Sequence, residues 1–215
     1  MINNETYLIS FETGTSGSFI KTILEQILAQ DHIAYQRVLE FPNAHAHDVS
    51  FFNPALMDDQ FYTFMANQTN NYISATIPYH NKPITFKEHF APNWKIFFSK
   101  FPNGKNIIIT FSEEMVKYVS NFRYYKYEMK NDFVANTNIM QWHVDKFPFS
   151  YKYPLVKPKE YEDRIIELKF EDILFDKEKV LNILTTMTNR SIPKFVDETY
   201  DNYLSAQKQV FPNLF

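Results

Sequence analysis

The segment Ser10-Phe-Glu-Thr-Gly-Thr-Ser-Gly-Ser-Phe-Ile20 decides the fold of this 215-residue chain. It holds two of the three glycines of the sequence, Gly14 and Gly17. Glycine permits a sharp backbone turn or a close approach to another group, so two glycines in one short segment indicate a specialised turn. The apolar residues 7–11 before it predict a buried strand, and apolar residues at helical spacing over 18–30 predict a helix after it.

The rest of the chain continues to alternate strand and helix patterns. Strands are predicted at 72–77, 106–111 and 165–169, and helices at 54–67, 94–100, 113–130, 177–189 and 193–209. Three prolines predict an irregular excursion at 147–158. This alternation predicts an α/β fold, a three-layer sandwich in which helices cover both faces of a mainly parallel sheet. We expect one domain spanning residues 1–215.

Composition excludes several classes of function. The net charge of -3 lacks the basic excess typical of nucleic-acid-binding proteins, so no nucleic-acid partner is expected. The apolar runs are shorter than the roughly 20 residues that span a bilayer, so no membrane partner is expected. The absence of cysteine fits a cytoplasmic protein. The preference for lysine over arginine, together with abundant Phe and Tyr, fits an AT-rich genome; a viral protein would then lie in the host cytoplasm or the virion.

The glycine turn has two interpretations. In a parallel sheet, the loop after the first strand lies at the carboxyl edge, where ligands bind. Backbone N–H groups of residues 16–19 would then face a phosphate or sulfate, helped by the helix dipole, and Gly14 and Gly17 would let the backbone wrap around the anion. The alternative is a tight strand-to-helix turn with Ser16 as a simple N-cap. The Walker A pattern does not fit, because Ile20 precedes Lys21-Thr22 where glycine is required.

Three segments together resemble the sulfotransferase family. The loop Thr15-Ser-Gly-Ser18 resembles its 5'-phosphosulfate-binding loop, and Lys100-Phe-Pro-Asn-Gly-Lys-Asn-Ile-Ile-Ile109 resembles the entry to the strand that carries its 3'-phosphate site. Residues 166–181, beginning Ile-Glu-Leu-Lys-Phe-Glu-Asp-Ile-Leu, resemble a later strand-to-helix segment of the family. The resemblance implies a P-loop-like, nucleotide-binding fold and 3'-phosphoadenosine 5'-phosphosulfate as the sulfuryl donor.

The resemblance also implies a set of site residues and shows departures from the family pattern. The implied nucleotide-binding residues are Gly14, Thr15, Ser16, Gly17, Ser18, Phe19, Ser112 and Ser120. Thr15 stands where the family has a cation that offsets charge on the leaving group, and Ser112 stands where it has an arginine. The family's catalytic histidine would align with Thr76, which leaves His80 as a displaced candidate base. These departures indicate altered or lost chemistry.

The sequence His45-Ala-His47-Asp48 offers a second pair of candidate bases. In an extended segment both imidazoles face one side and could polarise an acceptor hydroxyl. A metal site needs a third convergent ligand, which the sequence does not supply, so no metal is expected. The alternative for this segment is a solvated loop.

Two functions therefore follow from the sequence. The first is a transferase that moves a sulfuryl group from 3'-phosphoadenosine 5'-phosphosulfate to a hydroxyl acceptor, for example a carbohydrate. The rival is a catalytically degenerate sulfotransferase fold that acts as a binding or structural protein, for example in a virus, with protein partners. The glycine loop and Ser120 favour the enzyme, whereas the missing cations favour the rival.

Overall fold

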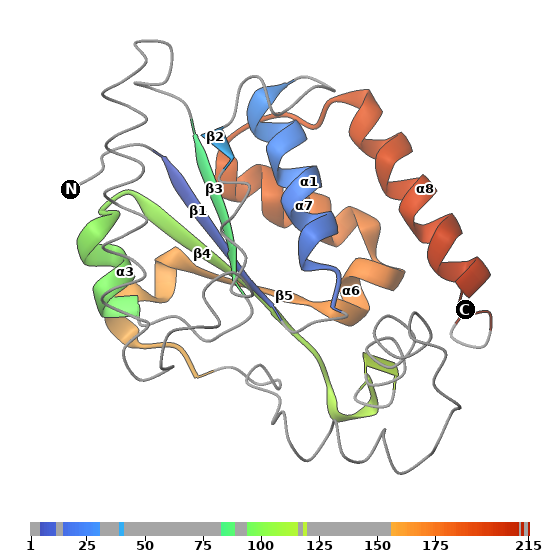
Figure 1. Ribbon diagram of the computed structural model, residues 1–215, viewed down its shortest axis with the longest axis horizontal. Coiled ribbons are helices and arrows are strands. Elements are labelled where there is room, and N and C mark those ends of the chain that lie inside the picture. The colour runs from blue at the N-terminus through green and yellow to red at the C-terminus, as the bar shows by residue number, and fades with distance from the viewer. Residues whose placement is uncertain are drawn as a thin grey trace, which may run out of the picture.

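The computed structural model describes residues 5–11, 15–30, 39–40, 83–88, 94–115, 118–119, 156–210, 212 and 215. The strands are β1 (Thr6–Phe11), β2 (Leu39–Glu40), β3 (Ile84–Glu88), β4 (Gly104–Thr110) and β5 (Ile165–Lys169), and the helices are α1 (Gly17–Ala29), α3 (Trp94–Lys100), α6 (Phe170–Phe175), α7 (Lys177–Thr188) and α8 (Lys194–Val210). Short 3-10 helices cover Glu113–Met115 and Lys159–Arg164. The five strands form one parallel sheet in the order β2-β3-β1-β4-β5 (Figure 1).

The predicted fold class is confirmed, and most predicted elements among the described residues are present. The strands expected at 7–11, 106–111 and 165–169 correspond to β1, β4 and β5, and β1 runs parallel to β4 as expected. The helices expected at 18–30, 94–100, 177–189 and 193–209 correspond to α1, α3, α7 and α8. The strand β3 was not predicted. The elements expected at 54–67 and 72–77, most of the helix at 113–130 and most of the excursion at 147–158 lie outside the described residues.

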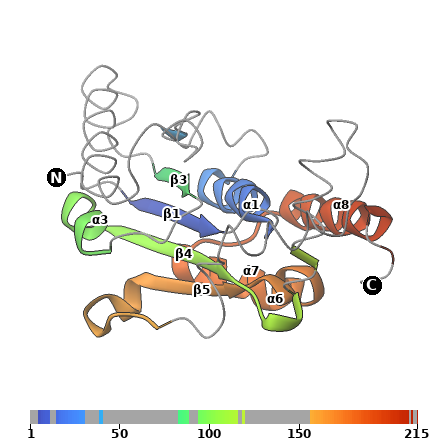
Figure 2. The ribbon, with the colours of Figure 1, turned by 60° about the horizontal axis from the view of Figure 1, so that its bottom comes forward.

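One face of the sheet carries the largest apolar core of the described residues. Ile9 of β1 lies level with Ile107 of β4, and Phe11 lies level with Ile109. These side chains pack with buried residues of α1, α6, α7 and α8, so all four helices lie against this face. Figures 1 and 2 show α1, α7 and α8 grouped beside the sheet. Every residue of β1 is buried, as expected for the central strand of a sheet covered on both faces.

The opposite face packs against α3. The Trp94 indole N–H donates to the side-chain oxygen of Asn106 at 2.9 Å, and the Asn106 amide donates to Ser10 Oγ at 3.0 Å. Phe101, which follows α3, contacts Phe86 of β3 with ring centroids 5.3 Å apart. The sheet therefore lies between two helical layers, which is the predicted three-layer arrangement. No helix among the described residues is long and apolar enough to cross a membrane.

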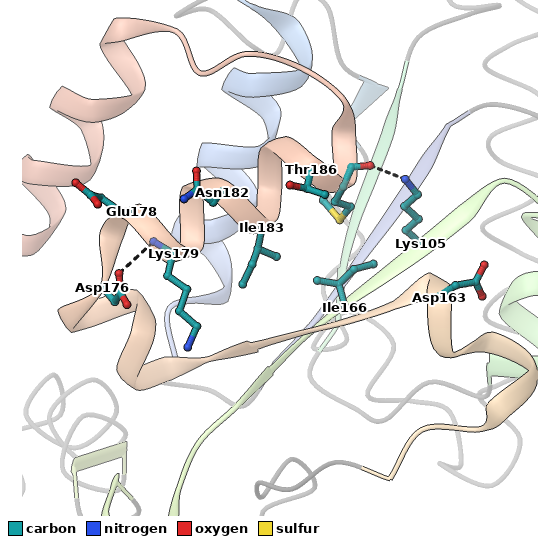
Figure 3. Close-up of a pocket in the computed structure, with 10 residues that line it drawn as sticks. Lys105, Asp163, Ile166, Asp176, Glu178, Lys179, Asn182, Ile183 and Thr186 are labelled. Carbon is teal, nitrogen blue, oxygen red and sulfur yellow. Dashed lines mark hydrogen bonds between the residues drawn. The ribbon is translucent and has the colours of Figure 1, made fainter.

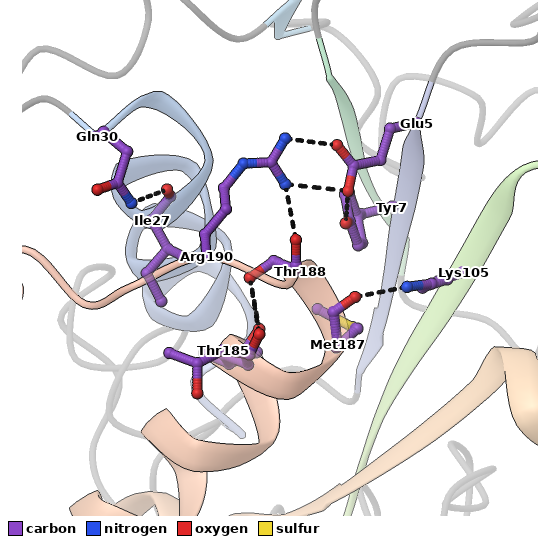
Figure 4. A network of polar contacts seen from close by, with 10 residues as sticks. Glu5, Tyr7, Ile27, Gln30, Lys105, Thr185, Met187, Thr188 and Arg190 are labelled. Carbon is purple, nitrogen blue, oxygen red and sulfur yellow. Dashed lines mark hydrogen bonds and ion pairs between the residues drawn. The ribbon is translucent and has the colours of Figure 1, made fainter.

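A polar network joins the start of β1 to the end of α7 (Figure 4). Arg190 binds both carboxylate oxygens of Glu5, at 2.7 and 3.0 Å, and also donates to the Thr188 carbonyl at 3.1 Å. The Tyr7 hydroxyl donates to the same carboxylate, and Lys105 donates to a carbonyl at the end of α7. Burial of Glu5 favours its protonated form, but the hydrogen bonds from Arg190 and Tyr7 outweigh burial, so the pKa of Glu5 is lowered.

This network predicts a pH-dependent cost for Arg190→Met. Because the pKa of Glu5 is lowered from 4.5 in the folded state, its stabilisation is complete above that value and is lost as the pH falls through the folded pKa. Both side chains are about one-third exposed, so we expect the variant to lose about 1 kcal/mol of unfolding free energy at pH 7. Urea unfolding from pH 7 to pH 3 should show this cost shrinking; a cost independent of pH would contradict the ionic role of the pair.

Candidate anion site at the start of helix α1

The end of β1 and the start of α1 meet at the centre of the sheet. In chain order, β1 leads through α1 to β2 on one side, whereas β4 leads to β5 on the other. Connections leaving two adjacent strands in opposite directions open a crevice at their carboxyl ends, where ligands of open α/β sheets bind. The turn 12–16 follows β1 at this point, and its described part is Thr15 and Ser16.

Ser16 sets the direction in which α1 begins. Its backbone is left-handed, with φ 66° and ψ 20°, and its carbonyl accepts the N–H of Ile20 at 3.0 Å. Ser16 occupies the N-cap position of α1, as the alternative interpretation expected, but its side chain makes no capping hydrogen bond. The backbone N–H groups of Gly17, Ser18 and Phe19 form the first turn, where a helix offers donors and a positive dipole end to an anion.

Gly17 is required by the packing of the protein itself. A β-carbon at Gly17 would overlap the ring of Phe11, which is the last residue of β1 and is 4% exposed. The close approach that makes glycine necessary here is therefore made by an aromatic side chain of the core. Ser16 has a positive φ, whereas Gly17 does not.

Helix α8 contacts the first turn of α1. The hydroxyl of Tyr203 hydrogen-bonds the hydroxyl of Ser16, and the Tyr203 ring stacks on Phe19 with centroids 3.7 Å apart and planes 8° apart. Burial raises the pKa of Tyr203 to about 12, although the hydrogen bond with Ser16 lowers it. Tyr203 therefore carries its proton at neutral pH and is able to donate it in this hydrogen bond. This contact was not predictable from the sequence, because 187 residues separate its partners.

Lys21 is the first cation along α1, and its ammonium group points away from the start of the helix. Lys21 Nζ lies 2.6 Å from Glu25 Oε1, one turn farther along the helix, and both residues are nearly fully buried, at 4% and 9% exposure. The Thr85 hydroxyl of β3 donates to the same carboxylate oxygen.

Thr15, which stands where the sulfotransferase family has a cation, is fully buried. Ser18 is exposed, so a charge can be introduced at this position without being buried.

The second predicted nucleotide position, Ser112, lies just beyond β4. Its backbone N–H donates to Glu171 Oε1 at 2.9 Å, and Glu171 Oε2 is buried with no hydrogen-bond partner among the described residues. The backbone N–H of Ser112 therefore already has a carboxylate partner. The structure brings together Thr15, Ser16, Gly17, Ser18 and Phe19. Gly14, Ser120 and the candidate bases His45, His47 and His80 lie outside the described residues.

A separate groove of about 870 Å³ runs between β5 and α7 (Figure 3). Ile166, Ile183 and Met187 form its apolar part. Charged residues line both ends: Lys105 and Asp163 at one, and Asp176, Glu178 and Lys179 at the other. None of the predicted site residues that the structure describes lines this groove. Within the described ranges, no group of three or more acidic or histidine side chains could hold a metal ion.

Comparisons with known proteins give no family assignment. No family model matches the chain, and no curated protein matches it. A crystal structure of retinol dehydratase with retinol and PAP matches 95% of this chain at 10% identity and a TM-score of 0.49, and the match spans 65% of that protein. An unliganded sugar kinase from Janibacter sp. HTCC2649 matches 90% of this chain and 98% of its own length, at 11% identity and a TM-score of 0.46. The fold assignment therefore depends on the strand order and connections described above.

Proposed function

We propose that this chain binds a phosphate-bearing nucleotide at the start of α1. The observation that carries the proposal is the left-handed Ser16, which starts a 13-residue helix at the carboxyl end of the central strand. In this arrangement the amides of Gly17, Ser18 and Phe19 would face the carboxyl edge of the sheet, where ligands of parallel α/β sheets bind.

We further propose that the nucleotide is 3'-phosphoadenosine 5'-phosphosulfate and that the protein transfers its sulfuryl group to a hydroxyl acceptor, for example a carbohydrate. This step depends on the sequence resemblance. The acceptor oxygen would form a bond to sulfur while the bond from sulfur to the bridging oxygen breaks. Adenosine 3',5'-bisphosphate would leave with the electron pair, and His80, His45 or His47 would take the acceptor proton. Ser120 and Gly14 remain proposed nucleotide contacts.

The second candidate is a binding or structural protein that has lost the chemistry, as in a viral protein with protein partners. The observation that favours it is the state of the positions where a sulfotransferase has cations. Thr15 is buried and uncharged, and Ser112 carries no charge. Lys21, the nearest cation along α1, is paired with Glu25. Such a protein would not transfer sulfuryl.

Two variants of exposed Ser18 test the anion site, because a helix N-terminus disfavours a cation, whereas a bound phosphate favours one. Because of the helix dipole, Ser18→Lys should lower the free energy of unfolding by about 0.5 kcal/mol, and Ser18→Glu should raise it by a similar amount. Affinity for adenosine 3',5'-bisphosphate should move in the opposite sense, about fivefold tighter for lysine and fivefold weaker for glutamate.

Calorimetric titration and thermal unfolding of the three proteins provide both readouts. If affinity follows stability, or if the wild-type protein shows no binding at millimolar nucleotide, the anion site is wrong. If binding is present but labelled sulfuryl is not transferred to any hydroxyl acceptor offered, the binding protein is the better description.

A further inference from the structure

Ser16 has a backbone conformation that needs support from its surroundings. Left-handed φ and ψ are unfavourable for a residue with a side chain, and such residues persist where neighbouring contacts hold them. In the described part of the chain, the other non-glycine residues with positive φ are Gln30 and Asn189, which end α1 and α7. Left-handed residues are common at the C-terminal ends of helices. Ser16 begins a helix, so that explanation does not apply to it.

Among the described residues, α8 contacts the Ser16 side chain. The Tyr203 hydroxyl reaches the Ser16 hydroxyl, while the Tyr203 ring is fixed by stacking on Phe19 in the first turn. Tyr200, one turn earlier in α8, meets the edge of Phe19 at a centroid distance of 4.9 Å and an interplanar angle of 85°. Tyr200 is fully buried and its hydroxyl donates to the Ile173 carbonyl at 2.9 Å, so it provides a fixed support.

We propose that Tyr203 is a positioning residue for the turn between β1 and α1. By holding Ser16 left-handed, it fixes the direction of the amides in the first turn of α1. Its consequence for ligand affinity rests on the proposed nucleotide function, whereas its effect on the turn does not. Because α8 supplies this contact, the packing of α8 and the geometry of the anion site are coupled.

The variant Tyr203→Phe tests the proposal, because it keeps the aromatic ring and removes the hydroxyl. The Ile20 amide, which donates to the Ser16 carbonyl, reports directly on the turn. In the ligand-free protein we expect about tenfold faster hydrogen exchange at Ile20, with α7 amides unchanged. Affinity for adenosine 3',5'-bisphosphate should fall about fivefold.

Two further variants separate positioning from general packing. Tyr118→Phe removes another partly buried hydroxyl that contacts α8, through Gln207 at 3.3 Å, and should leave Ile20 exchange unchanged. Ser16→Gly in the Tyr203→Phe background should restore slow Ile20 exchange and much of the affinity, because glycine adopts the left-handed conformation unaided.

Each outcome decides the proposal. Unchanged Ile20 exchange in Tyr203→Phe, faster exchange spread evenly over α1, α7 and α8, or no rescue by glycine would overturn it. Local acceleration with rescue would support it even if the wild-type protein binds no nucleotide; in that case the proposed function fails and the role of Tyr203 in the turn remains.

Discussion

Substitution of Gly17 by valine is expected to lower the free energy of unfolding by about 3 kcal/mol, because overpacking a filled core forces side chains and backbone to move. The branched side chain would overlap the ring of Phe11, which lies among buried residues of β1, α1 and β4. Gly17 lies within α1, so the cost comes from this steric overlap and not from an unfavourable φ. Urea unfolding monitored by circular dichroism measures the effect.

A double-mutant cycle with Phe11→Ala identifies the cause. Removing the ring opens the space that the valine needs, so Gly17→Val should cost at least about 1 kcal/mol less in the Phe11→Ala background. An equal cost in both backgrounds would show that Phe11 is not the obstacle. Loss of nucleotide binding in Gly17→Val would not by itself demonstrate a ligand contact, because the same change disturbs the core.

Substitution of Lys21 by methionine is expected to destabilise the protein by about 3–5 kcal/mol, because it leaves the buried Glu25 carboxylate without an opposite charge. The ammonium lies 2.6 Å from Glu25 Oε1 between α1 and β3, and Thr85 would remain as a neutral donor to that oxygen. Nucleotide affinity should stay nearly constant, because Lys21 is directed toward Glu25 rather than toward the start of the helix.

The double variant Lys21→Met/Glu25→Leu provides the matched control. Apolar groups of similar volume often replace a buried ion pair with little loss, so the double variant should recover most of the stability lost in Lys21→Met. Chemical unfolding of both proteins measures the recovery. A neutral Lys21→Met would mean that the pair is solvated, and a large drop in nucleotide affinity would mean that Lys21 reaches the anion.

The sequence predicted the elements that carry strong local signals. β1 and β4 contain apolar runs that are almost fully buried, and the partly buried β5 contains Ile165, Ile166 and Leu168. The helices α1, α7 and α8 show helical spacing of apolar residues. Asp176 accepts the N–H of Lys179 at 3.1 Å, which explains why α7 begins where its pattern begins. β3 was missed because this short strand follows Pro83 and ends in the charged residues Lys87 and Glu88. Local periodicity does not separate such a pattern from a loop.

The candidate site was predictable only in part. The position of the turn and the start of α1 follow from the glycines and from the apolar pattern after them. The reason why residue 17 must be glycine could not be predicted, because it is the ring of Phe11 in the preceding strand, and the sequence does not show which way that ring points. The partners of Ser16 and Lys21 lie on α8 and β3, at sequence separations that a local pattern does not encode.

Backbone amide chemical shifts during titration with adenosine 3',5'-bisphosphate test the anion site most directly. In isotope-labelled protein we expect saturable shifts that are largest for the amides of Gly17, Ser18 and Phe19, since these donors would bind the phosphate. Amides lining the groove between β5 and α7, such as that of Ile183, should move little. Shifts centred on that groove, or no shifts at millimolar nucleotide, would contradict a nucleotide site at the start of α1.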